Sequence, residues 1–92
     1  MVFDIDISKK VLLQVAYGSA EFSGYKQKAA NVTAEVCAIL KTMGFQGYIE
    51  DTGYRGYHVW VFFTEWIPVR YINQLTDYVQ SQMKNEGTDI AI

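Results

Sequence analysis

The sequence predicts an α+β fold in which a small three-to-four-stranded sheet has helices packed on one face. Residues 2–7 and 56–64 have the alternation, or the β-branched and aromatic composition, of strands. Residues 25–43 and 69–83 repeat apolar side chains at helical spacing. Strands and helices in this order pack as layers around one core, so we expect a single small domain over all 92 residues.

The N-terminal part begins with a clear strand and continues less clearly. In residues 2–7 the apolar side chains share one face, and Asp4 and Asp6 share the other. Ser8 is suited to cap a short helix over residues 9–17, which Gly18 would end. The apolar run within this segment fits a second strand equally well, so both alternatives stay open.

The best helical pattern covers residues 25–43 and follows an expected loop at residues 19–24. Gly44 comes directly after this pattern and is a typical end signal. We then expect a short strand at residues 47–51 and a glycine-bearing turn at residues 52–55. This turn leads into the long aromatic strand.

A last helix and strand complete the pattern. Pro68 suits the first turn of a helix, and apolar positions recur at helical spacing as far as Met83. Gly87 would stop this helix, and residues 88–92 would begin a further apolar strand.

Composition and charge narrow the class of protein. Half of the residues are hydrophobic, 15% are aromatic and the net charge is −2, which excludes a disordered chain and a strongly basic nucleic-acid binder. Any attraction to phosphate must come from a few positioned cations or metal ions. Cys37 is the single cysteine and is expected to be a buried thiol in a reducing compartment. With no leader pattern and no membrane-spanning run in the sequence, we expect a soluble, cytoplasmic protein without a membrane partner.

Asp4 and Asp6 are candidate metal ligands. Residues two apart on a strand point the same way and lie ~6.5–7 Å apart at the backbone, so these carboxylates project side by side. Such a pair can converge on one divalent ion, or bracket two ions ~3.5–4 Å apart as in phosphoryl and nucleotidyl transfer. Oxygen ligands favour Mg²⁺ or Mn²⁺. The alternative is that both are solvated on an exposed edge strand, although aspartate is disfavoured in strands.

The second candidate feature is the glycine-bearing turn. Gly53 and Gly56 allow a tight turn whose amide groups can approach phosphate oxygens. Arg55 adds a delocalised cation, Thr52 a hydroxyl, and His58 a ring that could donate to a phosphate. The alternative is a simple β-hairpin turn in which His58 packs among aromatic side chains and bonds a carbonyl.

Alternation along the long strand places His58, Trp60 and Phe62 on one face. If this is the face of Asp4 and Asp6, two large aromatic side chains lie beside the charged groups. They could stack against nucleic-acid bases. Alternatively, another part of a larger protein or a second copy of the chain covers them.

In this order, the two motifs resemble signatures of the archaeo-eukaryotic primase superfamily, which includes primase-polymerases and the polymerase domains of bacterial end-joining ligases. The first signature is an Asp-hydrophobic-Asp strand, matched by residues 4–6, DID. The second is a Ser-Gly-x-x-Gly-x-His-hydrophobic-Trp-like segment, matched by residues 52–60, TGYRGYHVW. The chain looks most like the primase-like domains of mobile-element conflict systems and of some reverse-transcriptase or CRISPR-associated proteins. The resemblance implies a partial primase palm with a sheet related to the RNA recognition motif.

The resemblance also implies roles for individual residues. Asp4 and Asp6 would hold catalytic Mg²⁺ or Mn²⁺ in a two-metal site, and with His58 they would form the catalytic set. Thr52, Arg55 and His58 would contact the triphosphate of the incoming nucleotide. Thr52 stands where the family usually has serine, a change that keeps the hydroxyl.

Two departures from the family pattern limit what we expect of the chain. A further metal-binding aspartate on a later strand has no counterpart, since Asp77 falls inside a helix and Asp89 opens the terminal strand. Family members usually have strands before the first motif and continue past a strand like residues 89–92 into a Pro-Lys-Gln segment. We therefore expect a fragment of a primase palm with an incomplete metal site.

The leading hypothesis is part of a metal-dependent nucleotidyltransferase. The parent protein would add NTPs or dNTPs to a primer–template nucleic acid or start a primer, and the fragment alone would be inactive. The alternatives are a non-catalytic module that binds nucleotides or nucleic acid, and an oligomerisation module whose aromatic side chains form a homodimer interface.

Overall fold

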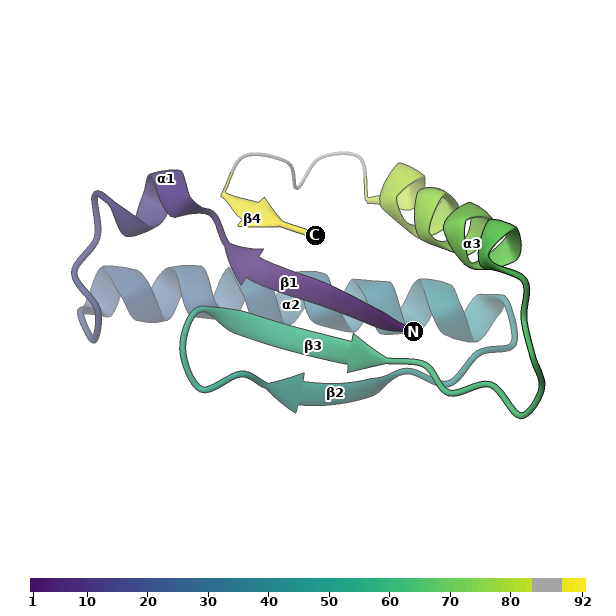
Figure 1. Cartoon of the computed structure of the whole chain (residues 1–92). Helices are drawn as coiled ribbons and strands as arrows, with labels where there is room; N and C mark the ends of the chain where they lie inside the picture. Colours follow the sequence, from purple (N-terminus) through teal and green to yellow (C-terminus); the bar gives the residue numbers. More distant parts are fainter. Residues whose placement is uncertain (84–88) are drawn as a thin grey trace.

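The computed structural model of the chain describes residues 1–83 and 89–92. Within these residues there are four strands and three helices (Figure 1). In chain order they are β1 (Val2–Ile7), α1 (Lys9–Leu12), α2 (Ala20–Thr42), β2 (Tyr48–Asp51), β3 (Gly56–Trp60), α3 (Val69–Gln82) and β4 (Ile90–Ala91).

The described strands form one antiparallel sheet in the order β2-β3-β1-β4. β1 lies inside the sheet between β3 and β4, and β2 and β3 form a hairpin at one edge. The long helix α2 runs across one face, behind β1 and β3 in the view of Figure 1. The expected α+β class with a small sheet is confirmed.

A hydrophobic core lies between the sheet and helices α2 and α3. Phe3, Ile5 and Ile7 of β1 are at most 4% exposed, because alternate residues of a strand point to the same face. The core also contains Val36 and Leu40 of α2, Val59 of β3, Leu75 and Val79 of α3, and Ile90 of β4. Burying this half of β1 leaves Asp4 and Asp6 on the opposite face of the sheet.

The first helix is shorter than expected. Ser8 does cap α1, since its side chain accepts a hydrogen bond from the Val11 amide at 3.4 Å. α1 ends at Leu12, and turns follow up to Gly18, whose φ is +81°. The helix expected over residues 9–17 is therefore confirmed only in its first turn, and the strand alternative for this segment is wrong.

The long helix begins earlier than expected. α2 starts at Ala20 rather than at residue 25, so the expected loop before it is wrong. Ser19 caps the helix by accepting a hydrogen bond from the Phe22 amide at 3.1 Å, and Phe22 is buried in the core. Gly24 suggested a loop, but a glycine inside a helix costs only about 1 kcal/mol, which core packing can offset.

β3 is shorter than the aromatic pattern predicts. It ends at Trp60 rather than at residue 64, opposite Val2 and Tyr48, where its antiparallel partners β1 and β2 begin. Val61 still exchanges two hydrogen bonds with the main chain of Met1, at 2.9 and 3.1 Å, so pairing with the N-terminal segment continues one residue past the end of β3.

The remaining boundaries follow the sequence signals closely. Gly44, with φ +87°, directly follows Met43, the C-cap of α2. Pro68 directly precedes α3. α3 ends at Gln82, and Gly87, its expected stop, lies outside the described residues together with residue 88. Among the described helices, none is both long and apolar enough to cross a membrane.

Candidate functional site

The face of the sheet opposite α2 carries the candidate residues in rows, because directly paired residues of antiparallel strands point to the same face. The rows are Val2–Trp60–Tyr48, Asp4–His58–Glu50 and Asp6–Gly56. We call the first the apolar row and the second the ionisable row. The sequence left open whether His58 shares a face with Asp4 and Asp6, and this register shows that it does.

The ionisable row places a histidine between two carboxylates. His58 Nδ1 lies 2.8 Å from Glu50 Oε1, and His58 Nε2 lies 3.6 Å from Asp4 Oδ1. The hydrogen bond to Glu50 is the largest of the influences that raise the pKa of His58, and the charge of Asp4 adds to it. The same hydrogen bond, with one from Trp60, lowers the pKa of Glu50. The row therefore favours a cationic His58.

Asp4 and Asp6 interact directly, as their spacing predicts. Burial raises the pKa of Asp6, and a hydrogen bond with Asp4 and the charge of Asp4 raise it further. Arg55 Nη2 lies 3.5 Å from Asp6 Oδ2 and partly opposes this rise. Each of two neighbouring carboxylates disfavours the ionisation of the other, and a nearby cation stabilises the ionised form of both. Carboxylate oxygens are ligands that Mg²⁺ and Mn²⁺ prefer.

This carboxylate pair is not a complete metal cage. Within residues 1–83 and 89–92, no group of three or more His, Cys, Asp or Glu side chains is arranged to hold a metal ion. Asp4 is 61% exposed and Asp6 17% exposed at the side chain, so a bound ion would keep part of its coordination open to water or ligand oxygens.

The turn between β2 and β3 uses several of its own polar groups. The Thr52 hydroxyl and amide both donate to the Gly56 carbonyl, at 2.9 and 3.1 Å, and the Gly53 amide donates to Asp51 Oδ1 at 2.8 Å. Gly53 has φ +82°, a conformation that favours glycine. The Thr52 hydroxyl thus donates its proton to a partner inside the turn. Arg55 has five N–H donors, which is more than its ion pair with Asp6 uses.

Lys26 of α2 supports this turn from the helix side of the sheet. Its Nζ donates to Asp51 Oδ1 at 2.8 Å and to the carbonyls of Tyr54 and Gly56, both at 3.2 Å. The ammonium group lowers the pKa of Asp51 through this hydrogen bond. One cation therefore fixes the conformation of the segment that presents Arg55.

Sequence reasoning missed Glu50 and Lys26. Glu50 could have been found, because alternation on the expected strand at residues 47–51 and a short turn place it opposite His58. Lys26 had no comparable signal. It lies near the start of the expected helix over residues 25–43, where a lysine is usually solvated, and its partners are mostly backbone carbonyls.

Beyond the ionisable row, aromatic side chains gather on the same face. The Trp60 and Phe62 rings are nearly parallel, at 6° and 6.2 Å between centroids, and Tyr48 lies 5.8 Å from Phe62. Phe62 is 69% exposed and Tyr48 55% exposed. Stacked rings that are open to solvent offer a flat apolar surface next to the charged groups.

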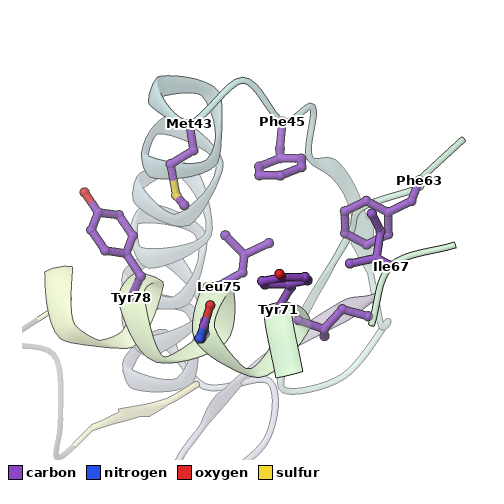
Figure 2. A pocket seen from close by; sticks show the side chains of 9 residues that line it. Met43, Phe45, Phe63, Ile67, Tyr71, Leu75 and Tyr78 are labelled. Atoms are coloured by element: carbon purple, nitrogen blue, oxygen red, sulfur yellow. The ribbon is translucent and has the colours of Figure 1, made fainter. Parts of the chain in front are cut away.

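A separate hollow of about 390 Å³ lies between α3, the end of α2 and the segment that follows β3 (Figure 2). Figure 2 shows Tyr71, Leu75 and Tyr78 of α3 facing it, with Met43 and Phe45 on the opposite side. This lining is mainly aromatic and aliphatic, so the hollow suits an apolar group rather than a phosphate.

Comparison with known proteins gives one clear result. A family model described as "TOTE conflict system, Archaeo-Eukaryotic Primase domain" matches residues 1–92, the whole of the chain. No curated protein and no solved structure matches the chain significantly.

Proposed function

The chain belongs to the archaeo-eukaryotic primase domain family of the TOTE conflict system, and we propose that it provides metal and nucleotide-phosphate ligands to a metal-dependent primase-polymerase. The observation that carries the proposal is the strand register, which brings Asp4, Asp6 and His58 onto one face with Arg55 beside them. These are the residues of the two motifs on which the resemblance rests.

Asp4 and Asp6 would hold the divalent cation, Mg²⁺ or Mn²⁺. When bound, such an ion neutralises the negative charge that develops at the phosphate under attack. The raised pKa of Asp6 supports this role, because after burial it is the neighbouring Asp4 carboxyl that raises this pKa, as expected for crowded negative charge.

Arg55 and His58 would bind the β- and γ-phosphates of an NTP or dNTP. Arg55 can pair with two phosphate oxygens at once, and a cationic His58 adds one charge-assisted hydrogen bond. Thr52 would contribute mainly by shaping the turn, because its hydroxyl already donates to Gly56. The turn thus orients a triphosphate while the aspartates hold the cation.

In the parent protein the nucleotide would be added to a primer–template nucleic acid. The sequence has no match for the further metal-binding aspartate of the family, so we expect the chain alone to bind nucleotide without extending a primer. Binding is therefore the property to measure.

Mn²⁺ and ATP titrations followed by NMR test the proposal. Paramagnetic Mn²⁺ should broaden the amide signals of β1 and β3 around Asp4 and His58, and the broadening should be lost in Asp4→Asn and Asp6→Asn. Metal-dependent ATP binding should weaken at least about tenfold in His58→Ala, as expected for the loss of a charge-assisted hydrogen bond. Asp77→Asn is the matched control, since Asp77 is an exposed aspartate on α3.

Two results would contradict the proposal. One is Mn²⁺ broadening that does not change when both aspartates are replaced, and the other is the absence of ATP binding in the presence of either metal. ATP binding that is indifferent to Asp4 and Asp6 would instead favour a non-catalytic nucleotide-binding module.

The aromatic side chains favour a second candidate function, a module that binds single-stranded nucleic acid without catalysis. Base stacking on an aromatic side chain contributes ~1–3 kcal/mol per base, and Trp60 and Phe62 offer parallel rings. A short single-stranded oligonucleotide should then quench Trp60 fluorescence without metal, and Phe62→Ser should weaken its binding. Quenching confined to the metal-loaded protein would favour the first function.

A further inference from the structure

Glu50 lies on the edge strand β2 and is outside both motifs on which the proposed function rests. One of its oxygens, Oε1, makes two hydrogen bonds, accepting from His58 Nδ1 at 2.8 Å and from Trp60 Nε1 at 3.1 Å. An ionised carboxylate is an acceptor without a proton, so both ring N–H groups donate to it. The single oxygen therefore connects the ionisable row to the apolar row.

These two bonds fix the orientation of the rings. The His58 and Trp60 rings lie nearly perpendicular, at 88° and 6.0 Å between centroids. A histidine ring can rotate about its last torsion, which is broad and roughly two-fold, and this rotation exchanges Nδ1 with Cδ2 and Nε2 with Cε1, so that each nitrogen moves to the other side of the ring. The bond to Glu50 selects one arrangement, in which Nδ1 faces β2 and Nε2 faces Asp4 at 3.6 Å.

The selected arrangement matters for a ligand. Because Nδ1 is already bonded to Glu50, Nε2 is the ring nitrogen that remains for a phosphate oxygen beside the aspartates. Without Glu50 the ring would also populate the rotated arrangement, and its remaining donor would point toward the edge of the sheet.

We propose that Glu50 is a positioning residue, which holds the His58 ring with Nε2 toward Asp4 and thereby raises the affinity of this site for a triphosphate. The effect on triphosphate affinity rests on the proposed function, whereas the orientation of the His58 ring can be measured without any nucleotide. Glu50 itself would not touch the phosphates.

The chain is well suited to a direct test, because His58 is the single histidine and Trp60 is one of two tryptophans. The ¹⁵N signals of the His58 ring report which nitrogen is hydrogen-bonded. The indole N–H signal of Trp60 reports the second bond, and Trp66 serves as an internal reference because it is fully exposed. We expect Glu50→Ala to shift the His58 and Trp60 signals and to leave the Trp66 signal in place.

Glu50→Gln should retain much of the arrangement, because the same oxygen takes both bonds and the amide oxygen of glutamine can replace it. In ATP titrations with Mg²⁺, we expect Glu50→Ala to weaken binding about fivefold to tenfold, and Glu50→Gln to recover most of this loss. Glu35→Gln is the matched control, since Glu35 is an exposed glutamate on α2.

A double-mutant cycle separates positioning from a general electrostatic effect. If Glu50 acts through His58, Glu50→Ala should change ATP affinity little when His58 is already alanine. Equal effects of Glu50→Ala in the two backgrounds would overturn the proposal, as would His58 ring signals that are unchanged in Glu50→Ala.

Failure of the proposed function would look different. If ATP with Mg²⁺ does not bind even the unmodified chain, the nucleotide site is wrong, and the ring signals alone decide whether Glu50 orients His58. If ATP binds and depends on Asp4 but not on Glu50, the nucleotide site stands and the positioning role is overturned.

Discussion

Gly56 begins β3 at the point where the strand passes directly against β1. A Cβ atom at this position would overlap the Ile5 carbonyl oxygen and crowd the backbone and side chain of Asp6. Because the nearest obstacle is backbone in the sheet, it cannot move aside. The close approach keeps Asp6 next to Arg55, so the glycine has a packing role as well as a role in the turn.

We therefore predict that Gly56→Ala lowers the free energy of unfolding by about 1–3 kcal/mol, the usual range for overpacking a tight site. Chemical denaturation measures this change. Gly24→Ala is the control: Gly24 lies within α2 with open space around its Cα, so alanine should stabilise by about 0.5–1 kcal/mol. Similar stability of Gly56→Ala and the unmodified chain would mean that β1 and β3 are not packed in this register.

The hydrogen bond between His58 and Glu50 makes stability depend on pH. The folded-state pKa of His58 is raised above its ordinary value of 6.5, so this stabilisation is fully present below that value. It is lost as the pH rises through the raised folded pKa. Because both side chains are partly exposed, solvent screening keeps the effect small.

We predict that an NMR titration gives His58 a midpoint above 6.5 in the unmodified chain and a lower midpoint in Glu50→Gln. The stability difference between these two proteins should be larger at about pH 5.5 than at about pH 8.5. A difference that grows with pH would show that the sign of this linkage is wrong.

At the scale of elements, α2 depends on its cap. Ser19 satisfies the Phe22 amide at the start of the helix, and the first turn that it fixes contains the buried Phe22 and leads to Lys26. Since Lys26 fixes the β2–β3 turn, the start of this helix contributes to the geometry of the candidate site.

We predict that Ser19→Ala costs about 1 kcal/mol in the free energy of unfolding, as N-cap substitutions usually do. Ser23→Ala is the control, because Ser23 is exposed inside the same helix, where alanine is the better helix former. Urea denaturation of the two variants measures the difference. Equal effects would place the start of the helix after Ser19, as the sequence alone suggested.

The β2–β3 hairpin shows which features local sequence patterns can predict and which they cannot. Its glycine turn and the start of β3 were predictable from residues 52–56, because turn glycines and a β-branched, aromatic strand are local patterns. The end of β3 was not predictable, since residues 61–64 have the same strand-like composition as residues 57–60. It depends on where the antiparallel neighbours β1 and β2 begin, and only the assembled sheet contains that information.

At the scale of the whole molecule, the two faces of the sheet differ. One is covered by α2, and the other presents Phe62 and Tyr48, which are 69% and 55% exposed, beside an edge strand, β2. Exposed aromatic surface and an open strand edge both favour contact with another chain. We propose that the isolated domain self-associates through this face.

We predict that sedimentation equilibrium of the isolated chain shows reversible dimers at high concentration, and that Phe62→Glu shifts the chain to monomer by placing a charge on the apolar surface. Val69→Glu is the control, since Val69 is 71% exposed at the start of α3 and belongs to a helix rather than to the sheet. A chain that stays monomeric at every concentration would contradict this proposal.

The sequence by itself determined the order of most strands and helices, which side of β1 is apolar, and that two motifs resembling primase signatures are present. These properties depend on the spacing of residues along one segment, so local periodicity is sufficient to predict them. Only the tertiary structure decided that Asp4, His58 and Glu50 form one row, that Lys26 reaches the turn, and where β3 ends. Such features depend on the register between strands and on the packing of a helix against them, which arise from contacts between residues far apart in the chain.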